Sequence, residues 1–173
     1  LAALVLSATA CERAPQRAEP DPVDLFTVNT QTYTYGDMVP VHVAYTAVAR
    51  WRGWSDADIE ARRDWLVNNV VRLESGGCWM ALGGTLYNAV GDPCESPAVR
   101  GRRSDAGFGQ VTSAGWGRNG HVCKAEGLCS RWAVINSAWD SMNAMLSLYE
   151  HAGKFPWCWD RRAQRYHSCH LAP

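Results

Sequence analysis

The sequence predicts an α+β, mainly helical domain whose connecting loops are tied down by disulfides. Two segments carry apolar residues at helical spacing, one starting at Ser55 and ending at Gly76-Gly77, the other over residues 137–152. Residues 76–130 lie between them, rich in glycine and cysteine and without long periodicity, which indicates loops with a small β-element. Hydrophobic residues make up 47% of the 173 residues and charged residues 20%, so the composition is that of a folded domain.

The first predicted helix is the more informative of the two. Ser55 and Asp58 have the spacing of a capping box, which marks a helix start. Its apolar face consists of Ile59, Leu66, Val70 and Leu73, flanked by Trp65. Glu74 follows Val70 by four residues, so we expect this carboxyl in the last helical turn and along the buried stripe. In the second predicted helix the apolar stripe is formed by Trp139, Met142, Leu146 and Tyr149, and Gly153 ends it.

Four regions are expected along the chain. Residues 1–10 are apolar and end in small residues, which indicates part of a signal peptide. Residues 11–22 contain three prolines and alternating charges, the composition of a flexible tether. Residues 23–50 contain Thr, Tyr and Val at strand-like density and predict an extended arm or a short hairpin. Residues 51–173 form the predicted folded domain.

The cysteines support export to the cell envelope. Small residues directly before Cys11 resemble a lipobox, so Cys11 is a candidate lipidated N-terminus that would anchor the chain to a membrane; cleavage after Ala10 to release a soluble protein is the alternative. The other six cysteines form an even set, as expected for disulfides in an oxidising compartment. Local pairing is favoured, which would join Cys78 to Cys94, Cys123 to Cys129 and Cys158 to Cys169, although six cysteines allow 15 connectivities.

Several kinds of ligand are disfavoured. Lys plus Arg and Asp plus Glu both number 17, and this balance argues against nucleic acid as a partner. His121 lies near Cys123, and His167 and His170 flank Cys169, but the usual zinc-ligand spacings are missing, so we expect no metal and no cofactor. The histidines, His151 included, are expected to have surface or structural roles.

Nine tryptophans are expected mostly in the core, with one or two lining a sugar cleft.

Two short motifs carry a resemblance to a known family. Arg72-Leu-Glu-Ser-Gly-Gly77 is followed by Ala106-Gly-Phe-Gly-Gln-Val111, and this order and separation are similar to those of the lytic transglycosylase and goose-type lysozyme superfamily. The match covers about residues 55–160 and looks closer to the small actinobacterial or phage-type variants. Gly109 stands where the family has a larger residue, and the family's third motif, an Ala-Tyr-Asn-x-Gly turn, is absent.

The resemblance implies a lysozyme-like domain that cleaves peptidoglycan glycan strands. Glu74 would be the catalytic acid, which requires a pKa raised by burial so that the carboxyl keeps its proton. In the family the 2-acetamido group of the substrate attacks the anomeric carbon, and the same Glu then takes a proton from the 6-hydroxyl to give a 1,6-anhydro product. The resemblance also implies that Ser75, Gln110, Phe108 and Asp105 lie at the substrate.

Three alternatives stay open. An inverting hydrolase would need a second carboxylate, with Asp105 as the best candidate, at about 6.5–9.5 Å from the first. A non-catalytic envelope module that binds glycan or a partner protein would explain the missing third motif. A cystine-rich binding domain unrelated to lysozymes predicts no deep cleft beside Glu74.

Overall fold

The computed structural model describes residues 17–83, 105–160 and 165–166, and it confirms the mainly helical prediction. The helical elements are α1 (Pro22–Asn29), α2 (Val39–Trp51), α3 (Asp56–Arg63), the π-helix η1 (Asp64–Val71), α4 (Arg72–Glu74), α5 (Ser113–Trp116), α6 (His121–Glu126), α7 (Arg131–Val134), α8 (Ala138–Ala152) and α9 (Phe155–Cys158). Strands β1 (Trp159–Asp160) and β2 (Arg165–Tyr166) pair antiparallel. Within the described ranges, no helix is both long enough and apolar enough to cross a bilayer.

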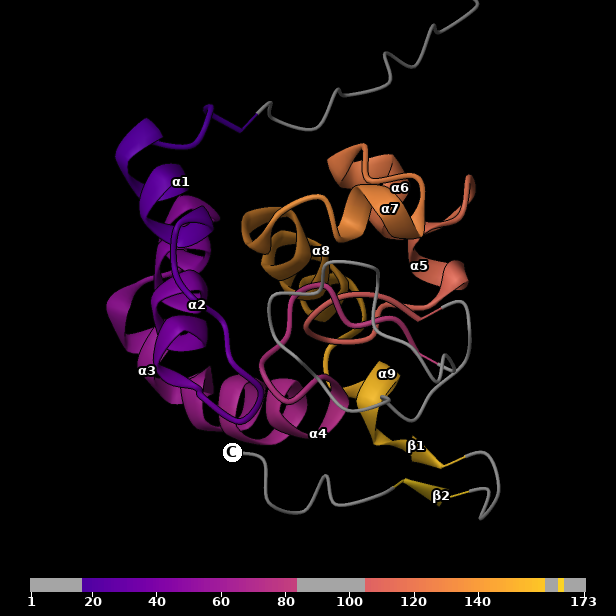
Figure 1. Cartoon of the computed structure of the whole chain (residues 1–173). Coiled ribbons are helices and arrows are strands. Elements are labelled where there is room, and N and C mark those ends of the chain that lie inside the picture. The colour runs from indigo at the N-terminus through magenta and orange to yellow at the C-terminus, as the bar shows by residue number, and fades with distance from the viewer. Residues whose placement is uncertain (1–16, 84–104, 161–164, 167–173) are drawn as a thin grey trace, which may run out of the picture.

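Helix α8 lies at the centre of the domain. Figure 1 shows α1, α2 and α3 on one side of it and the short helices α5, α6 and α7 on the other. The main core between α2, η1 and α8 buries residues such as Val41, Tyr45, Val48, Leu66, Val67, Met142 and Leu146. Each such side chain contributes roughly 1.5–3 kcal/mol through removal from water. A smaller core, which includes Val122, Val134 and Ala144, lies under the short helices.

The helix predicted to start at Ser55 forms as three consecutive segments, α3, η1 and α4. Ser55 caps it, since its Oγ accepts a hydrogen bond from the Asp58 N–H at 3.1 Å. Ile59, Leu66 and Val70 are buried as expected. Leu73 was expected on the same face, but this prediction is wrong, because its side chain is 80% exposed. The π-helical segment is wound more loosely than an α-helix, so it shifts the phase of the residues that follow.

The extended arm or hairpin predicted for residues 23–50 is also wrong. This segment forms α1 and α2, with Pro22 at the first helical position and the Asp21 side chain as the cap. In α2 the buried residues include Val41, Ala44, Tyr45 and Val48, which have helical spacing. Burial of this face against the core outweighs the strand preference of its Val, Thr and Tyr residues.

The described end of the predicted tether lies against the domain. The Arg17 guanidinium pairs with Glu126 and Glu150 at 3.2 Å each, and the Trp51 indole N–H donates to the carbonyl oxygen of Ala18 at 2.8 Å. Pro22 already belongs to α1. Arg17 and Ala18 of the predicted tether therefore contact the domain, and the tether prediction itself stays a prediction. The predicted signal peptide and Cys11 lie outside the described residues.

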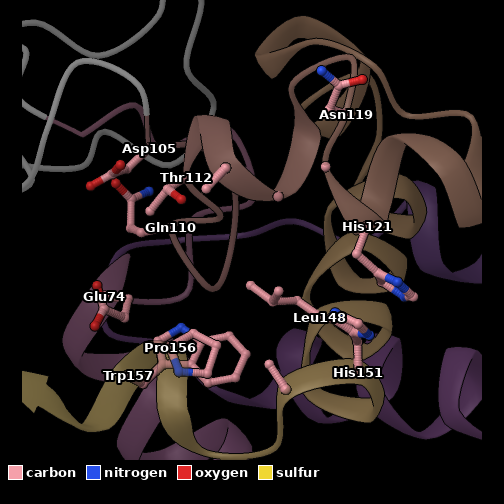
Figure 2. A pocket seen from close by; sticks show the side chains of 14 residues that line it. Glu74, Asp105, Gln110, Thr112, Asn119, His121, Leu148, His151, Pro156 and Trp157 are labelled. Carbon is pink, nitrogen blue, oxygen red and sulfur yellow. The ribbon is translucent and has the colours of Figure 1, made fainter.

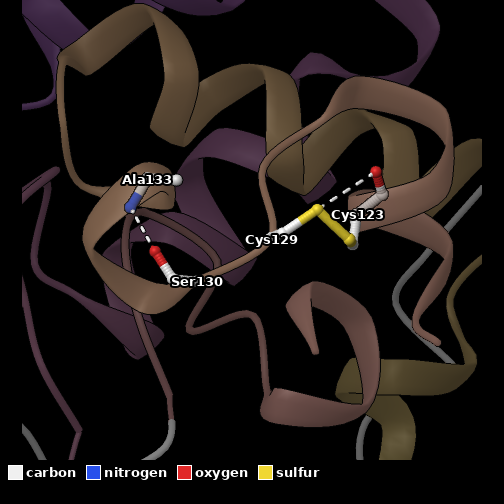
Figure 3. The surroundings of a disulfide bond; sticks show 4 residues. All are labelled: Cys123, Cys129, Ser130 and Ala133. Atoms are coloured by element: carbon white, nitrogen blue, oxygen red, sulfur yellow. Dashed lines mark hydrogen bonds between the residues drawn. A yellow bond between two sulfur atoms is a disulfide. The ribbon is translucent and has the colours of Figure 1, made fainter. Parts of the chain in front are cut away.

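One of the predicted local disulfides is present. Cys123 and Cys129 are bonded across the turn that follows α6 (Figure 3), where Gly127 has a φ of 73°. Cys78 is disulfide-bonded as well, whereas Cys94, its favoured partner, lies outside the described residues. The same holds for Cys169, the favoured partner of Cys158. Because the Cys123 sulfur is engaged with Cys129, it is not available to a metal beside His121.

Candidate active site

A cavity of about 530 Å³ opens beside Glu74. Figure 2 shows its lining side chains, which come from the end of α4, the turn before α5, the start of α6, the end of α8 and α9. The lining residues are Glu74, Asp105, Gln110, Thr112, Ala114, Gly115, Asn119, Gly120, His121, Leu148, His151, Ala152, Pro156 and Trp157. Its volume falls in the range of small-molecule sites, about 300–1,000 Å³.

Glu74 is held at the cavity by the way its helix ends. It is the last residue of α4, and Gly76 and Gly77 follow with φ values of 63° and 89°, which turn the chain away. A Cβ on Gly76 would lie 2.1 Å from the Tyr35 ring. Glycine is therefore required there both by the backbone angle and by the packing of Tyr35, and this pair fixes the end of the helix.

The environment of Glu74 favours its protonated form. Burial raises its pKa, and the negative charge of Asp105 raises it further, to about 7. Such a carboxyl is largely protonated at slightly acid pH and partly protonated at neutral pH. It can therefore donate a proton to a ligand in the cavity.

Asp105 is positioned by a small set of β-bridges. Its carbonyl oxygen accepts the Gly83 N–H at 2.9 Å, and the adjacent Ala106 is bridged to both Leu82 and Val111. Its side chain is largely buried and lines the cavity with Glu74. These bridges are the small β-element expected within residues 76–130. They bring the first motif and the second motif together at one cavity.

Gln110 lines the cavity and carries a buried acceptor atom. Its Nε2 donates to the carbonyl oxygens of Ala81 at 3.1 Å and Gly107 at 3.0 Å, which fixes the orientation of the amide. Its Oε1 is buried and has no hydrogen-bond partner within residues 17–83, 105–160 and 165–166. Gln110 also has a φ of 48°, an uncommon backbone angle for a residue other than glycine. A ligand N–H or O–H would satisfy the acceptor, because a buried oxygen without a donor is costly.

Two predicted substrate-binding residues do not line the cavity. Ser75 is 1% exposed, and its hydroxyl donates to the carbonyl oxygen of Val71 one turn earlier, at 3.1 Å. Phe108 is fully buried in the main core, where its ring centroid lies 5.6 Å from that of Tyr33. The structure thus places both side chains away from the cavity, because the turn directs Phe108 into the core and leaves Gln110 at the cavity. Phe108 instead anchors the turn, and its N–H donates to the Ser141 hydroxyl at 2.8 Å.

Packing against α8 explains why position 109 is a glycine. A Cβ there would lie 2.5 Å from the Cγ of Met145 on α8. The Met145 side chain thus occupies the space that a larger residue at 109 would need.

The sequence alone did not assign Trp157, His121 or His151 to the cavity, although all three line it. Trp157 is the one tryptophan among them, and its indole N–H donates to the Gly109 carbonyl oxygen at 2.8 Å. His121 and His151 lie at the other side of the cavity, with parallel rings 4.0 Å apart. No spacing signal predicts these positions, because α6 and α8 are brought together only by the fold. Among the described residues, no three His, Cys, Asp or Glu side chains are grouped as a metal site.

Comparisons of the chain with protein-family models, curated proteins and solved structures found no significant match. A functional assignment therefore depends on the motifs and on the geometry of this cavity.

Proposed function

We propose that this chain is a lysozyme-like enzyme that cleaves the glycosidic bond between N-acetylmuramic acid and N-acetylglucosamine in peptidoglycan, with Glu74 as its acid and base. The observation that carries the proposal is the Glu74 carboxyl, buried enough to have a pKa of about 7, at a cavity that also contains Gln110 of the second motif. A glycosidic oxygen is a poor leaving group, and such a carboxylic acid can protonate it.

The reaction would proceed in two steps. In the first, Glu74 gives its proton to the leaving oxygen while the C1–O bond breaks, and the 2-acetamido oxygen of the muramic acid bonds to C1. In the second, the Glu74 carboxylate takes the proton of the 6-hydroxyl, whose oxygen displaces the acetamido group at C1. The product is a 1,6-anhydro sugar, and Glu74 is protonated again. No second carboxylate nucleophile is needed.

Other lining residues have roles that follow from their contacts. The Gln110 Oε1 would accept a hydrogen bond from the substrate, with the acetamido N–H as a suitable donor. The negative charge of Asp105 would help Glu74 to keep its proton. Trp157 would offer an aromatic surface to the apolar face of a sugar ring. Because Ser75 and Phe108 are turned away from the cavity, they would act by supporting the helix end and the turn.

The proposed setting is the cell envelope. Apolar residues before Cys11, the lipobox-like sequence and the disulfide between Cys123 and Cys129 support export. Lipidation of Cys11 would keep the enzyme at a membrane, close to glycan strands. The ion pairs of Arg17 would then fix where the chain leaves the domain toward that anchor.

Loss of turbidity of isolated sacculi tests the proposal. We expect Glu74→Gln to abolish cleavage, because the amide cannot donate a proton of the required acidity. Glu60→Gln is a matched control, since this glutamate lies on the same continuous helix with a 76% exposed side chain. Equal activity of the wild type and Glu74→Gln would end the proposal. Mass spectrometry of the released muropeptides separates the reaction types, since anhydro ends indicate a transglycosylase and reducing ends indicate a hydrolase.

The second candidate is a glycan-binding module without catalysis, which the missing third motif favours. It predicts that the wild type and Glu74→Gln bind sacculi equally and release nothing. Co-sedimentation with sacculi, measured beside turbidity, distinguishes it from the enzyme.

A further inference from the structure

A pair of histidines forms the part of the cavity wall that lies across from Glu74. His121 is the first residue of α6, and His151 lies in the last turn of α8. Their rings are nearly parallel, at 6°, with centroids 4.0 Å apart, and both line the cavity that contains Glu74. Figure 2 shows Leu148 between this pair and the Glu74 side of the cavity.

The cavity has an uneven distribution of ionisable groups. The acidic side chains among its described lining residues, Glu74 and Asp105, are both on one side. Among the described residues that line it, only His121 and His151 can become cations. A ligand with a negative group would therefore be repelled by Asp105 on the Glu74 side and could form a charge-assisted hydrogen bond on the histidine side, which also sets its orientation.

The stacked geometry suits an anion better than a metal ion. The lone pairs and N–H bonds of an imidazole lie in the ring plane, and two parallel planes do not direct them to a common point. A metal needs such convergence, and about four ligands in the case of zinc. N–H groups at neighbouring edges of two such rings could instead each donate to one oxygen of a carboxylate, in hydrogen bonds strengthened by charge.

The charged side chains around the two histidines allow His121 to gain a proton when an anion binds. Without a ligand, the pKa of His121 is lowered, mainly by burial and then by His151, whereas Glu126 on α6 and Glu150 on α8 act in the opposite direction. Arg52, at the end of α2, also lowers it and holds both glutamates in ion pairs. Arg17 binds the same two carboxylates. These charges compensate one another, so an arriving anion would supply the countercharge that a protonated His121 lacks.

We propose that His121 and His151 form a subsite for a carboxylate group on the sugar chain. This inference rests on the proposed function, because a muramic-acid glycan carries such groups. The carboxylate has two sources, the lactyl group of muramic acid and the peptide attached to that lactyl group. The subsite would place the carboxylated sugar at the histidine side and the bond to be cleaved near Glu74.

Ligand binding to the Glu74→Gln variant, which is expected not to cleave, tests the subsite. The full chain carrying Glu74→Gln is titrated with N-acetylmuramic acid, with muramyl dipeptide, whose only carboxylates are on its peptide, and with the neutral N-acetylglucosamine. Imidazole NMR signals report the pKa values of His121 and His151. We expect N-acetylmuramic acid or the dipeptide to raise both pKa values, and N-acetylglucosamine to leave them unchanged.

Histidine variants supply the second readout. In the same background, His121→Gln or His151→Gln should weaken binding of the carboxylated ligand by about tenfold and leave the neutral sugar unaffected. His42→Gln is the matched control, because this histidine lies on α2 and outside the cavity. His151 is exposed, so its variant keeps the fold even if His121→Gln does not.

The outcomes separate the two proposals. If N-acetylmuramic acid binds at the pair and the dipeptide does not, the lactyl carboxylate is the ligand group; dipeptide binding identifies the peptide carboxylate. Equal affinity for charged and neutral sugars, or unchanged binding in both histidine variants, would overturn the subsite. Wild-type chain that binds the carboxylated ligand at the pair and leaves sacculi intact would overturn the proposed reaction and retain the subsite.

Discussion

Glu74 and Asp105 line the same cavity, and the Asp105 charge adds to burial in raising the Glu74 pKa to about 7. The two residues reach this cavity by different means. A glycine pair ends the helix of Glu74, whereas β-bridges to residues 82 and 111 hold the segment of Asp105. Burial and the Asp105 charge together keep the Glu74 carboxyl partly protonated at a pH where carboxyls are normally ionised.

The pH profile of cleavage should reflect this pKa. Glu74 acts first as an acid, so the initial rate should fall as the pH rises through about 7, where the carboxyl loses its proton. Initial rates of turbidity loss between pH 5 and pH 9 measure it. A rate that stays constant from pH 5 to pH 9 would contradict the role of Glu74.

Asp105→Asn should move this profile to lower pH. Removal of the charge at position 105 takes away one of the two causes that raise the Glu74 pKa. The same pH series, recorded for the variant, measures the shift. Loss of activity at every pH would instead assign Asp105 the role of base in a hydrolase, and an unchanged profile would contradict the electrostatic effect.

Glu74→Gln should stabilise the fold at high pH. The folded-state pKa of about 7 is above the ordinary value of 4.5, so the folded chain holds a proton that the unfolded chain releases. Wild-type stability therefore decreases as the pH rises from about 4.5 to about 7. At pH 8 the variant should gain roughly 1–3 kcal/mol in the free energy of unfolding, and at pH 4 little. Urea denaturation at both pH values checks this, with Glu60→Gln as the control that should show no such gain.

Arg52→Met should destabilise the fold far more than Arg50→Met. The Arg52 side chain is 1% exposed and pairs with Glu126 and Glu150, so its removal leaves the buried Glu126 and the partly exposed Glu150 with the more exposed Arg17 as their cationic partner. The expected loss is about 3–5 kcal/mol. Arg50 pairs with Asp56 on the surface, where both side chains are mostly exposed, and its removal should cost less than about 1 kcal/mol. Similar losses in the two variants, measured by urea denaturation, would contradict the importance of the buried network.

Gly107→Ala should be more harmful than Gly36→Ala. Both glycines have a positive φ, of 79° and 86°, so alanine introduces backbone strain of about 1 kcal/mol at either position. At Gly107 the new Cβ would also lie 2.5 Å from the Ser141 hydroxyl, whereas nothing lies within 4 Å at Gly36. We expect an additional loss of about 1–3 kcal/mol for Gly107→Ala. The difference between the two melting temperatures isolates the steric contribution.

Local sequence patterns were sufficient for features that depend on neighbouring residues. The cap at Ser55, the apolar stripe of α8, the helix end at Gly76-Gly77 and the disulfide between Cys123 and Cys129 were all predicted correctly. Helix periodicity, capping and glycine conformation are determined within a few residues, so they can be recognised without a fold. The same patterns failed at Leu73, because a π-helical segment changes the helical phase in a way that no residue type signals.

The tertiary structure alone decided which side chains share the cavity. Phe108 and Gln110 are two residues apart, yet one enters the core beside Tyr33 and the other lines the cavity. Residues 23–50 became helices because α2 buries its apolar face against the core, although their composition favours strands. His121 and His151 meet only where α6 packs on α8. Such placements depend on contacts between segments far apart in the chain, and a local pattern holds no information about them.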